Sequence, residues 1–125
     1  LFTLKFTYPG KTIKKPEFVT LRVFASGGQG YWFNEHQNLT LDADGSQSEI
    51  GEMSWEGQTS RPSGSLPSIS MESVVKDIPF DNFLRLSQAK KPAFAVGRRT
   101  FKLTEKQAEA LRNFALLMQE EGLEF

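Results

Sequence analysis

The fold is decided mainly by residues 78–118, which read IPFDNFLRLSQAKKPAFAVGRRTFKLTEKQAEALRNFALLM. Pro79 stands where a helix can begin, because proline fits the first helical turn, where its missing amide donor is not needed. Asp81 adds a negative charge near the positive end of that helix. The apolar face would carry Phe80, Phe83 and Leu84. We therefore predict a short amphipathic helix near residues 80–89.

A β-hairpin is predicted after this helix. Residues 93–96 and 100–103 are short segments rich in apolar, aromatic and β-branched side chains, as strands are. Gly97-Arg98 lies between them, and glycine supplies the positive φ that tight hairpin turns require. The two segments are therefore expected to pair.

A second helix is predicted near residues 105–120. Thr104 and Gln107 have the spacing of a capping box, in which each side chain bonds to the backbone N–H of the other residue. Spacings of three and four residues then place one apolar stripe along the helix. The stripe consists of Ala108, Leu111, Phe114, Ala115 and Met118.

The rest of the chain has the alternation of apolar and polar residues that strands show. This pattern covers residues 2–8, 18–24, 39–43 and 69–78, with Asp44-Gly45 as a hairpin turn. Eleven Phe residues supply large apolar areas for a small core. We predict a mainly β, α+β fold: an antiparallel β-sandwich-like body with the two helices, formed as a single domain over residues 1–125.

Two further segments belong to this prediction. Residues 31–33, Tyr-Trp-Phe, have β character, and Ile50 and Met53 lie on the plausible return strand after Asp44-Gly45. Residues 56–68 are rich in Gly, Ser, Thr and Pro, and their prolines cannot donate to a strand ladder. We therefore expect a long, mobile loop near residues 56–68.

Composition limits the possible functions. Fifteen basic residues balance fifteen acidic ones, so no overall field attracts nucleic acid or an anionic bilayer. The absence of cysteine excludes disulfides and thiolate chemistry. No apolar run approaches the length of about 18 residues that a membrane-spanning helix needs, so no transmembrane segment is expected. The chain starts at Leu1, so a leader or lipid anchor upstream remains compatible with it.

Three motifs stand in the C-terminal half: FLRLSQAK at 83–90, VGRRTFKLTEKQ at 96–107 and ALRNFA at 110–115. In these motifs the chain resembles a family of uncharacterised bacterial proteins that typically look exported. Their FLK-x-x-NAK, F-x-L-T-x-x-Q and ALR-x-FA motifs follow a β-rich part. The resemblance implies a β-sandwich-like body with a C-terminal helix, in an extracytoplasmic setting: periplasmic, secreted or lipid-anchored. It implies no established activity.

Aromatic residues are the best indication of function. Neighbouring side chains of a strand point to opposite faces, so at least one ring of residues 31–33 must face away from the core. Flat rings with a polar edge serve both core packing and ligand binding. The candidate ligand-binding residues are Tyr31, Trp32, His36 and Trp55. We predict a non-enzymatic binding or assembly module whose partner is a protein, a small molecule or carbohydrate, or a second copy of the chain.

A different class of function stays open, namely a glycosidase-like hydrolase with paired carboxylates near Tyr31 to Trp55. Its candidates are Glu35, Asp42, Glu52 and Glu56. The single histidine, His36, lacks a nucleophile motif around any serine, and the spacing of the acids at 42, 44 and 49 departs from the calcium-loop pattern. No cofactor, metal or nucleic-acid partner is therefore expected.

We expect the basic clusters of the chain to be ordinary solvent-exposed charges, because no aromatic residues are interleaved with them in an RNA-binding pattern. They comprise Lys11, Lys14 and Lys15 in one group, and Lys90, Lys91, Arg98, Arg99 and Lys102 in another.

Overall fold

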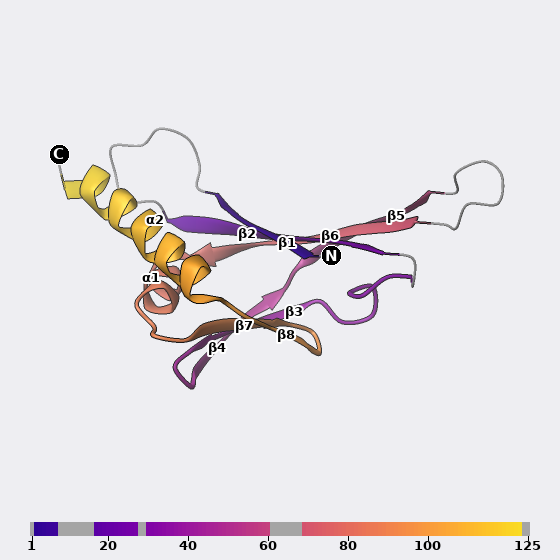
Figure 1. The fold of residues 1–125 in the computed structure, drawn as a ribbon, viewed down its shortest axis with the longest axis horizontal. Coiled ribbons are helices and arrows are strands. Elements are labelled where there is room, and N and C mark those ends of the chain that lie inside the picture. The colour runs from indigo at the N-terminus through magenta and orange to yellow at the C-terminus, as the bar shows by residue number, and fades with distance from the viewer. Residues whose placement is uncertain (1, 8–16, 28–29, 61–68, 124–125) are drawn as a thin grey trace.

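The computed structural model describes residues 2–7, 17–27, 30–60 and 69–123, with the backbone alone for 2–4, 60 and 118–123. Two four-stranded antiparallel sheets form separate layers, and the helices lie at one end of them (Figure 1). Sheet I has the spatial order β1 (Phe2–Thr7), β2 (Phe18–Gly27), β6 (Ile69–Pro79), β5 (Ser54–Ser60). Sheet II has the order β4 (Ser46–Glu52), β3 (Asn38–Ala43), β7 (Pro92–Val96), β8 (Arg99–Lys102). The predicted mainly β, sandwich-like fold with two helices is confirmed.

Alternating side chains of both sheets form one core. On β2, Val19, Leu21 and Val23 are completely buried, as the period of two predicts. Leu39 and Leu41 on β3 belong to the same apolar cluster. Each sheet therefore buries one face against the other and keeps its opposite face toward solvent.

An aromatic cluster joins the helices to the sheets. β6 ends at Pro79 and α1 (Phe80–Ser87) begins at the next residue, so the chain enters the helix without a loop. The ring of Phe83 is fully buried and lies 5.7 Å from the ring of Phe6, 6.3 Å from Phe80 and 5.9 Å from Phe114, measured between centroids. Phe114 belongs to α2 (Glu105–Leu123), so a single ring connects β1, α1 and α2.

Local capping and turn rules are confirmed. The backbone N–H of Thr104 donates to Gln107 Oε1 over 2.9 Å, and the N–H of Gln107 donates to Thr104 Oγ1 over 3.2 Å. β7 and β8 pair as a hairpin across Gly97, whose φ is +60°. Both elements follow from short-range chemistry that no distant contact has to override.

Three sequence expectations are wrong. Residues 31–33 belong to no strand: a bend covers residues 32–35, and the amides of Trp32 and Phe33 donate to the side chain of Glu72 and not to a neighbouring strand. Met53, expected on the strand that returns after Asp44-Gly45, follows the end of β4 and donates its N–H to the carbonyl of Gln37 over 2.9 Å. Residues 56–60, expected in the long loop, belong to β5, which pairs with β6 and lies at the edge of sheet I. Residues 61–68, the remainder of that expected loop, lie outside the described residues.

The turn between β3 and β4 is tied to the loop that precedes β7. Asp44 and Gly45 both have positive φ, +53° and +92°, as the predicted hairpin turn requires. The carboxylate of Asp44 accepts the backbone N–H of Lys90 over 2.9 Å and of Lys91 over 2.8 Å. These hydrogen bonds, assisted by the two lysine charges, lower the pKa of Asp44 below its ordinary value.

Replacing Asp44 by Asn is expected to make the free energy of unfolding less dependent on pH. A lowered native pKa means that this carboxylate stabilises the fold above its unfolded pKa, and that the contribution is lost as pH falls through the native pKa. Asn tolerates positive φ but offers only one acceptor oxygen. The wild-type protein should therefore have a larger free energy of unfolding than Asp44→Asn in urea titrations at neutral pH. This difference between the two proteins should become smaller as the pH is lowered. Glu49→Gln on exposed β4 is the control, and a difference that stays constant with pH would contradict the assignment.

Candidate ligand-binding site

A buried carboxylate positions the segment that carries the aromatic residues. Glu72 lies on the inward face of β6 with only 6% of its surface exposed. Its oxygens accept the backbone N–H of Trp32 over 2.6 Å and of Phe33 over 2.8 Å. The indole N–H of Trp55 donates to the same carboxylate over 3.2 Å. Three donors compensate the burial of this charged group, and they fix residues 30–37, called here the aromatic segment, against sheet I.

Gly57 makes room for two aromatic rings beside Glu72. It pairs with Glu72 across β5 and β6, and a Cβ atom at this position would overlap the six-membered ring of Trp55. The same Cβ would lie 2.9 Å from Cε1 of Tyr31. The rings of Tyr31 and Trp55 meet edge to face, 5.1 Å apart at 86°, and the Tyr31 hydroxyl bonds to Thr59 Oγ1 over 2.8 Å. The missing side chain of Gly57 therefore allows the packing that supports Tyr31.

Sheet II holds the other side of the aromatic segment. A Cβ atom on Gly97, in the β7–β8 turn, would lie 2.5 Å from the carbonyl oxygen of His36. The N–H of Gly97 donates to the carbonyl of Asn38 over 2.8 Å. Within the segment, Gln37 Nε2 donates to the carbonyl of Phe33 over 2.7 Å. The segment is therefore held by both sheets, although it contains no regular structure.

Trp32 presents the exposed ring that the sequence predicts. Phe33 is fully buried in the core, whereas 45% of the surface of Trp32 is exposed. The guanidinium carbon of Arg99 lies 4.1 Å from the centroid of the Trp32 ring, which is a cation–π distance. Arg99 is half-buried on β8, and its guanidinium packs against the Trp32 indole from sheet II.

A depression of about 620 Å³ opens beside this ring. Its walls come from the aromatic segment on one side and from the β7–β8 turn with the start of β8 on the other. The residues that line it are Tyr31, Trp32, Asn34, Glu35, His36, Arg98, Arg99 and Thr100. It therefore combines two aromatic side chains with amide, hydroxyl, carboxylate and guanidinium groups in one place.

The predicted binding residues lie close together. Tyr31, Trp32 and His36 line the depression, and the His36 side chain is exposed there. Trp55 does not line it but supports Tyr31 from below through the edge-to-face contact. Sequence reasoning assigned Arg98 and Arg99 to ordinary solvated charge, and it made no use of Glu72. Arg98 and Arg99 directly follow the glycine of the predicted turn, which was the one local signal of their position.

Three of the four carboxylates named for a hydrolase line three different hollows, and Glu52 is exposed at the end of β4. Of those four residues, Glu35 lines the depression beside Trp32. Asp42 accepts the N–H of Gly45 over 2.7 Å and lines a hollow on another part of the molecule. Glu56 lies on the outer face of sheet I.

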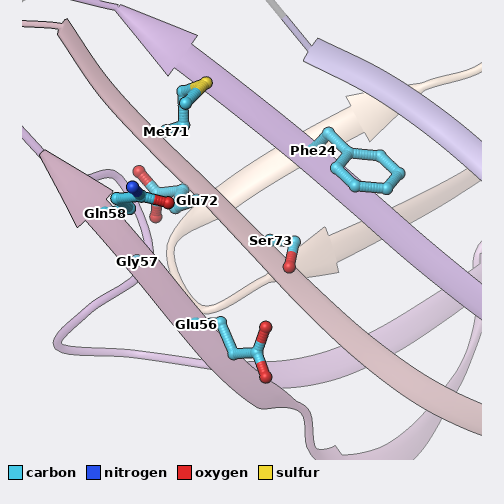
Figure 2. A pocket seen from close by; sticks show the side chains of 7 residues that line it. All are labelled: Phe24, Glu56, Gly57, Gln58, Met71, Glu72 and Ser73. Atoms are coloured by element: carbon cyan, nitrogen blue, oxygen red, sulfur yellow. The ribbon is translucent and has the colours of Figure 1, made fainter. Parts of the chain in front are cut away.

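The outer face of sheet I carries a shallower hollow. Figure 2 shows Phe24, Met71 and Gln58 around it, on β2, β6 and β5 respectively. Its volume of about 210 Å³ is below the range of about 300 to 1,000 Å³ that is usual for small-molecule sites.

A third hollow, of about 850 Å³, lies between the β3–β4 turn and the start of α2. It is larger than the depression beside Trp32, but no aromatic residue lines it. Lys90, Lys91 and Lys102 are balanced there by Asp42, Asp44 and Glu105. The two aspartates already accept backbone N–H groups, so their carboxylates stabilise the fold at this place and are not available to a ligand.

The described residues include no group of three or more His, Asp or Glu side chains arranged to hold a metal ion. Within the same part of the chain, neither helix combines the length and apolar character that a bilayer crossing requires.

Glu72→Gln should loosen the aromatic segment. The glutamine amide keeps one acceptor oxygen and turns an NH₂ group toward a backbone N–H, so one buried donor loses its partner. The expected cost is about 1 to 3 kcal/mol of unfolding free energy. Tryptophan fluorescence should change as well, because both Trp32 and Trp55 donate to Glu72. Both quantities are measured in one urea titration.

Glu56→Gln is the matched control, because it makes the same chemical change on the exposed face of the neighbouring strand. It should leave stability and fluorescence nearly unchanged. Equal effects of the two substitutions would show that Glu72 does not hold the segment.

Comparison of the chain with protein-family models, with curated proteins and with solved structures gave no match. Among the described residues, the most developed group of potentially functional side chains lines the depression between the aromatic segment and the β7–β8 turn.

Proposed function

We propose that the protein is a non-enzymatic binding module, and that the depression beside Trp32 takes a small saccharide-type ligand. The observation that carries this proposal is the exposed indole of Trp32, whose backbone amide donates to Glu72 on sheet I and whose ring packs against Arg99 of sheet II. The ring is thereby positioned in advance, and burial of its exposed apolar surface by a ligand would be favourable.

The chemistry around the ring suits a sugar. One face of a pyranose carries C–H groups that pack on a flat aromatic surface, while its hydroxyl groups need donors and acceptors at the rim. Asn34, Glu35 and Thr100 supply such groups within the depression. A volume of about 620 Å³ lies within the usual range for a small ligand.

Rigidity of the segment favours binding. Ordering a flexible side chain or loop costs free energy on association, and a segment already fixed by hydrogen bonds avoids most of that cost. Phe33 anchors the segment in the core, and Gln37 bonds to two of its carbonyl oxygens. The binding surface is therefore formed before a ligand arrives.

Binding is favoured over hydrolysis by the placement of acids. Most glycosidases use two carboxyl groups across the scissile bond. Among the described residues that line the depression, Glu35 is the one carboxylate.

The proposal includes an extracytoplasmic location, which rests on the resemblance to exported bacterial proteins. Fractionation of cells that express the complete gene product measures it directly. The protein should be found in the envelope or the medium, with a cytoplasmic enzyme as the control. Recovery in the cytoplasmic fraction alone would contradict the location and leave the binding proposal intact.

Trp32→Ala should weaken saccharide binding at least tenfold, equivalent to about 1.4 kcal/mol, because it removes the stacking surface. The measurement is binding of the purified domain to an immobilised glycan library, followed by calorimetric titration of the best glycan.

Phe24→Ala is the control, since Phe24 is also exposed but lies on the outer face of sheet I. Absence of any glycan binding, or an affinity unchanged by Trp32→Ala, would overturn the proposed function. Cleavage of a bound glycan would instead support the hydrolase.

A further inference from the structure

Resting on the proposed function, we infer that the ligand is an acidic saccharide, of the uronic-acid class, whose carboxylate is bound by Arg98 with Arg99 beside it. Three features of the depression favour such a ligand: its local charge, the position of its two arginines, and the short distance between a sugar ring and the carboxylate of a uronic acid.

Charge in the depression is unbalanced, although the whole chain is neutral. Fifteen basic and fifteen acidic residues cancel over the sequence. The described residues that line the depression, in contrast, include two arginines and one carboxylate, Glu35. The positive excess therefore belongs to this site and favours an anion there.

The backbone places both arginines at the rim. Gly97 adopts φ of +60° in the β7–β8 turn, and Arg99 pairs with Val96 across that turn. Arg98 lies between them at the tip and is exposed. The backbone positions of the two arginines at the rim thus follow from a tight turn.

Guanidinium chemistry favours a carboxylate. A planar guanidinium matches a carboxylate with two parallel N–H···O bonds, and such charge-assisted pairs are stronger than neutral hydrogen bonds. The Arg99 guanidinium occupies one face of the Trp32 ring at 4.1 Å, so a sugar would stack on the opposite face. A uronic acid carries its carboxylate one bond from the pyranose ring, and Arg98 at the rim would bind that carboxylate.

Single-stranded nucleic acid also combines stacking with negative charge, but it requires a basic groove that follows several phosphates. The depression holds one exposed indole and a local pair of arginines, and the protein has no overall positive charge. A compact monoanionic ligand fits this arrangement better.

The test is a titration of the isotope-labelled protein with three monosaccharides: methyl glucuronide, its uncharged methyl ester, and methyl glucoside. Chemical shifts of the Trp32 indole N–H and of the arginine Nε–H groups report binding. We expect the glucuronide to bind at least tenfold more tightly than the other two. Added salt should reduce this preference, because it screens the charge pair.

Arg98→Gln should remove the preference for the glucuronide while leaving the weak binding of methyl glucoside in place. Lys102→Gln is the matched control, because it removes one positive charge from the same hairpin but lines a different hollow. It should preserve the preference.

The outcomes separate the two proposals. Equal affinity for the acid and its ester, or equal effects of Arg98→Gln and Lys102→Gln, would overturn the acidic-ligand inference and leave saccharide binding standing. Binding by none of the three sugars would overturn both. A short single-stranded oligonucleotide that binds more tightly than the glucuronide would replace the inference with nucleic-acid recognition.

Discussion

The hydrogen bonds of Glu72 determine how the irregular part of the molecule is organised. A carboxylate that is 6% exposed needs several donors, and it finds two of them in consecutive backbone amides of the aromatic segment. Those amides would otherwise need a neighbouring strand. The Glu72 side chain therefore supplies the acceptors that a neighbouring strand would otherwise provide for these two amides. The aromatic segment can thus pass from sheet I to β3 of sheet II without forming a strand.

Two glycines complete this arrangement from opposite sides. Gly57 leaves space for the rings of Trp55 and Tyr31, and Gly97 leaves space for the backbone of His36. A Cβ atom at either position would displace the rings or backbone that pack there, so the shape of the depression requires glycine at both positions. The usual meaning of glycine in a strand or turn, a point of close approach, applies to both.

The elements predicted correctly are those that local chemistry determines. The capping box at Thr104, the Asp44-Gly45 turn and the alternation on β2 each depend on neighbours within a few residues, and each is present. The aromatic segment was misjudged because its partner Glu72 lies 39 or 40 residues away in sequence. β5 was missed because an edge strand with one neighbour tolerates polar, small residues that a central strand would exclude. Trp32 is exposed because of the bend and not because of the expected strand alternation, and its arginine partner depends on a tertiary contact.

Phe33 and Trp32 show how the proposed binding surface would be coupled to the stability of the fold. They are adjacent residues whose amides share one carboxylate, yet one ring is completely buried and the other is 45% exposed. A change that displaces the backbone of Phe33 also displaces that of Trp32, because the two residues share one planar peptide unit. The proposed binding surface is consequently tied to the core without belonging to a regular element. A ligand that stacks on Trp32 would in turn stabilise the contact between the two sheets, since anything that binds only the native arrangement raises its stability.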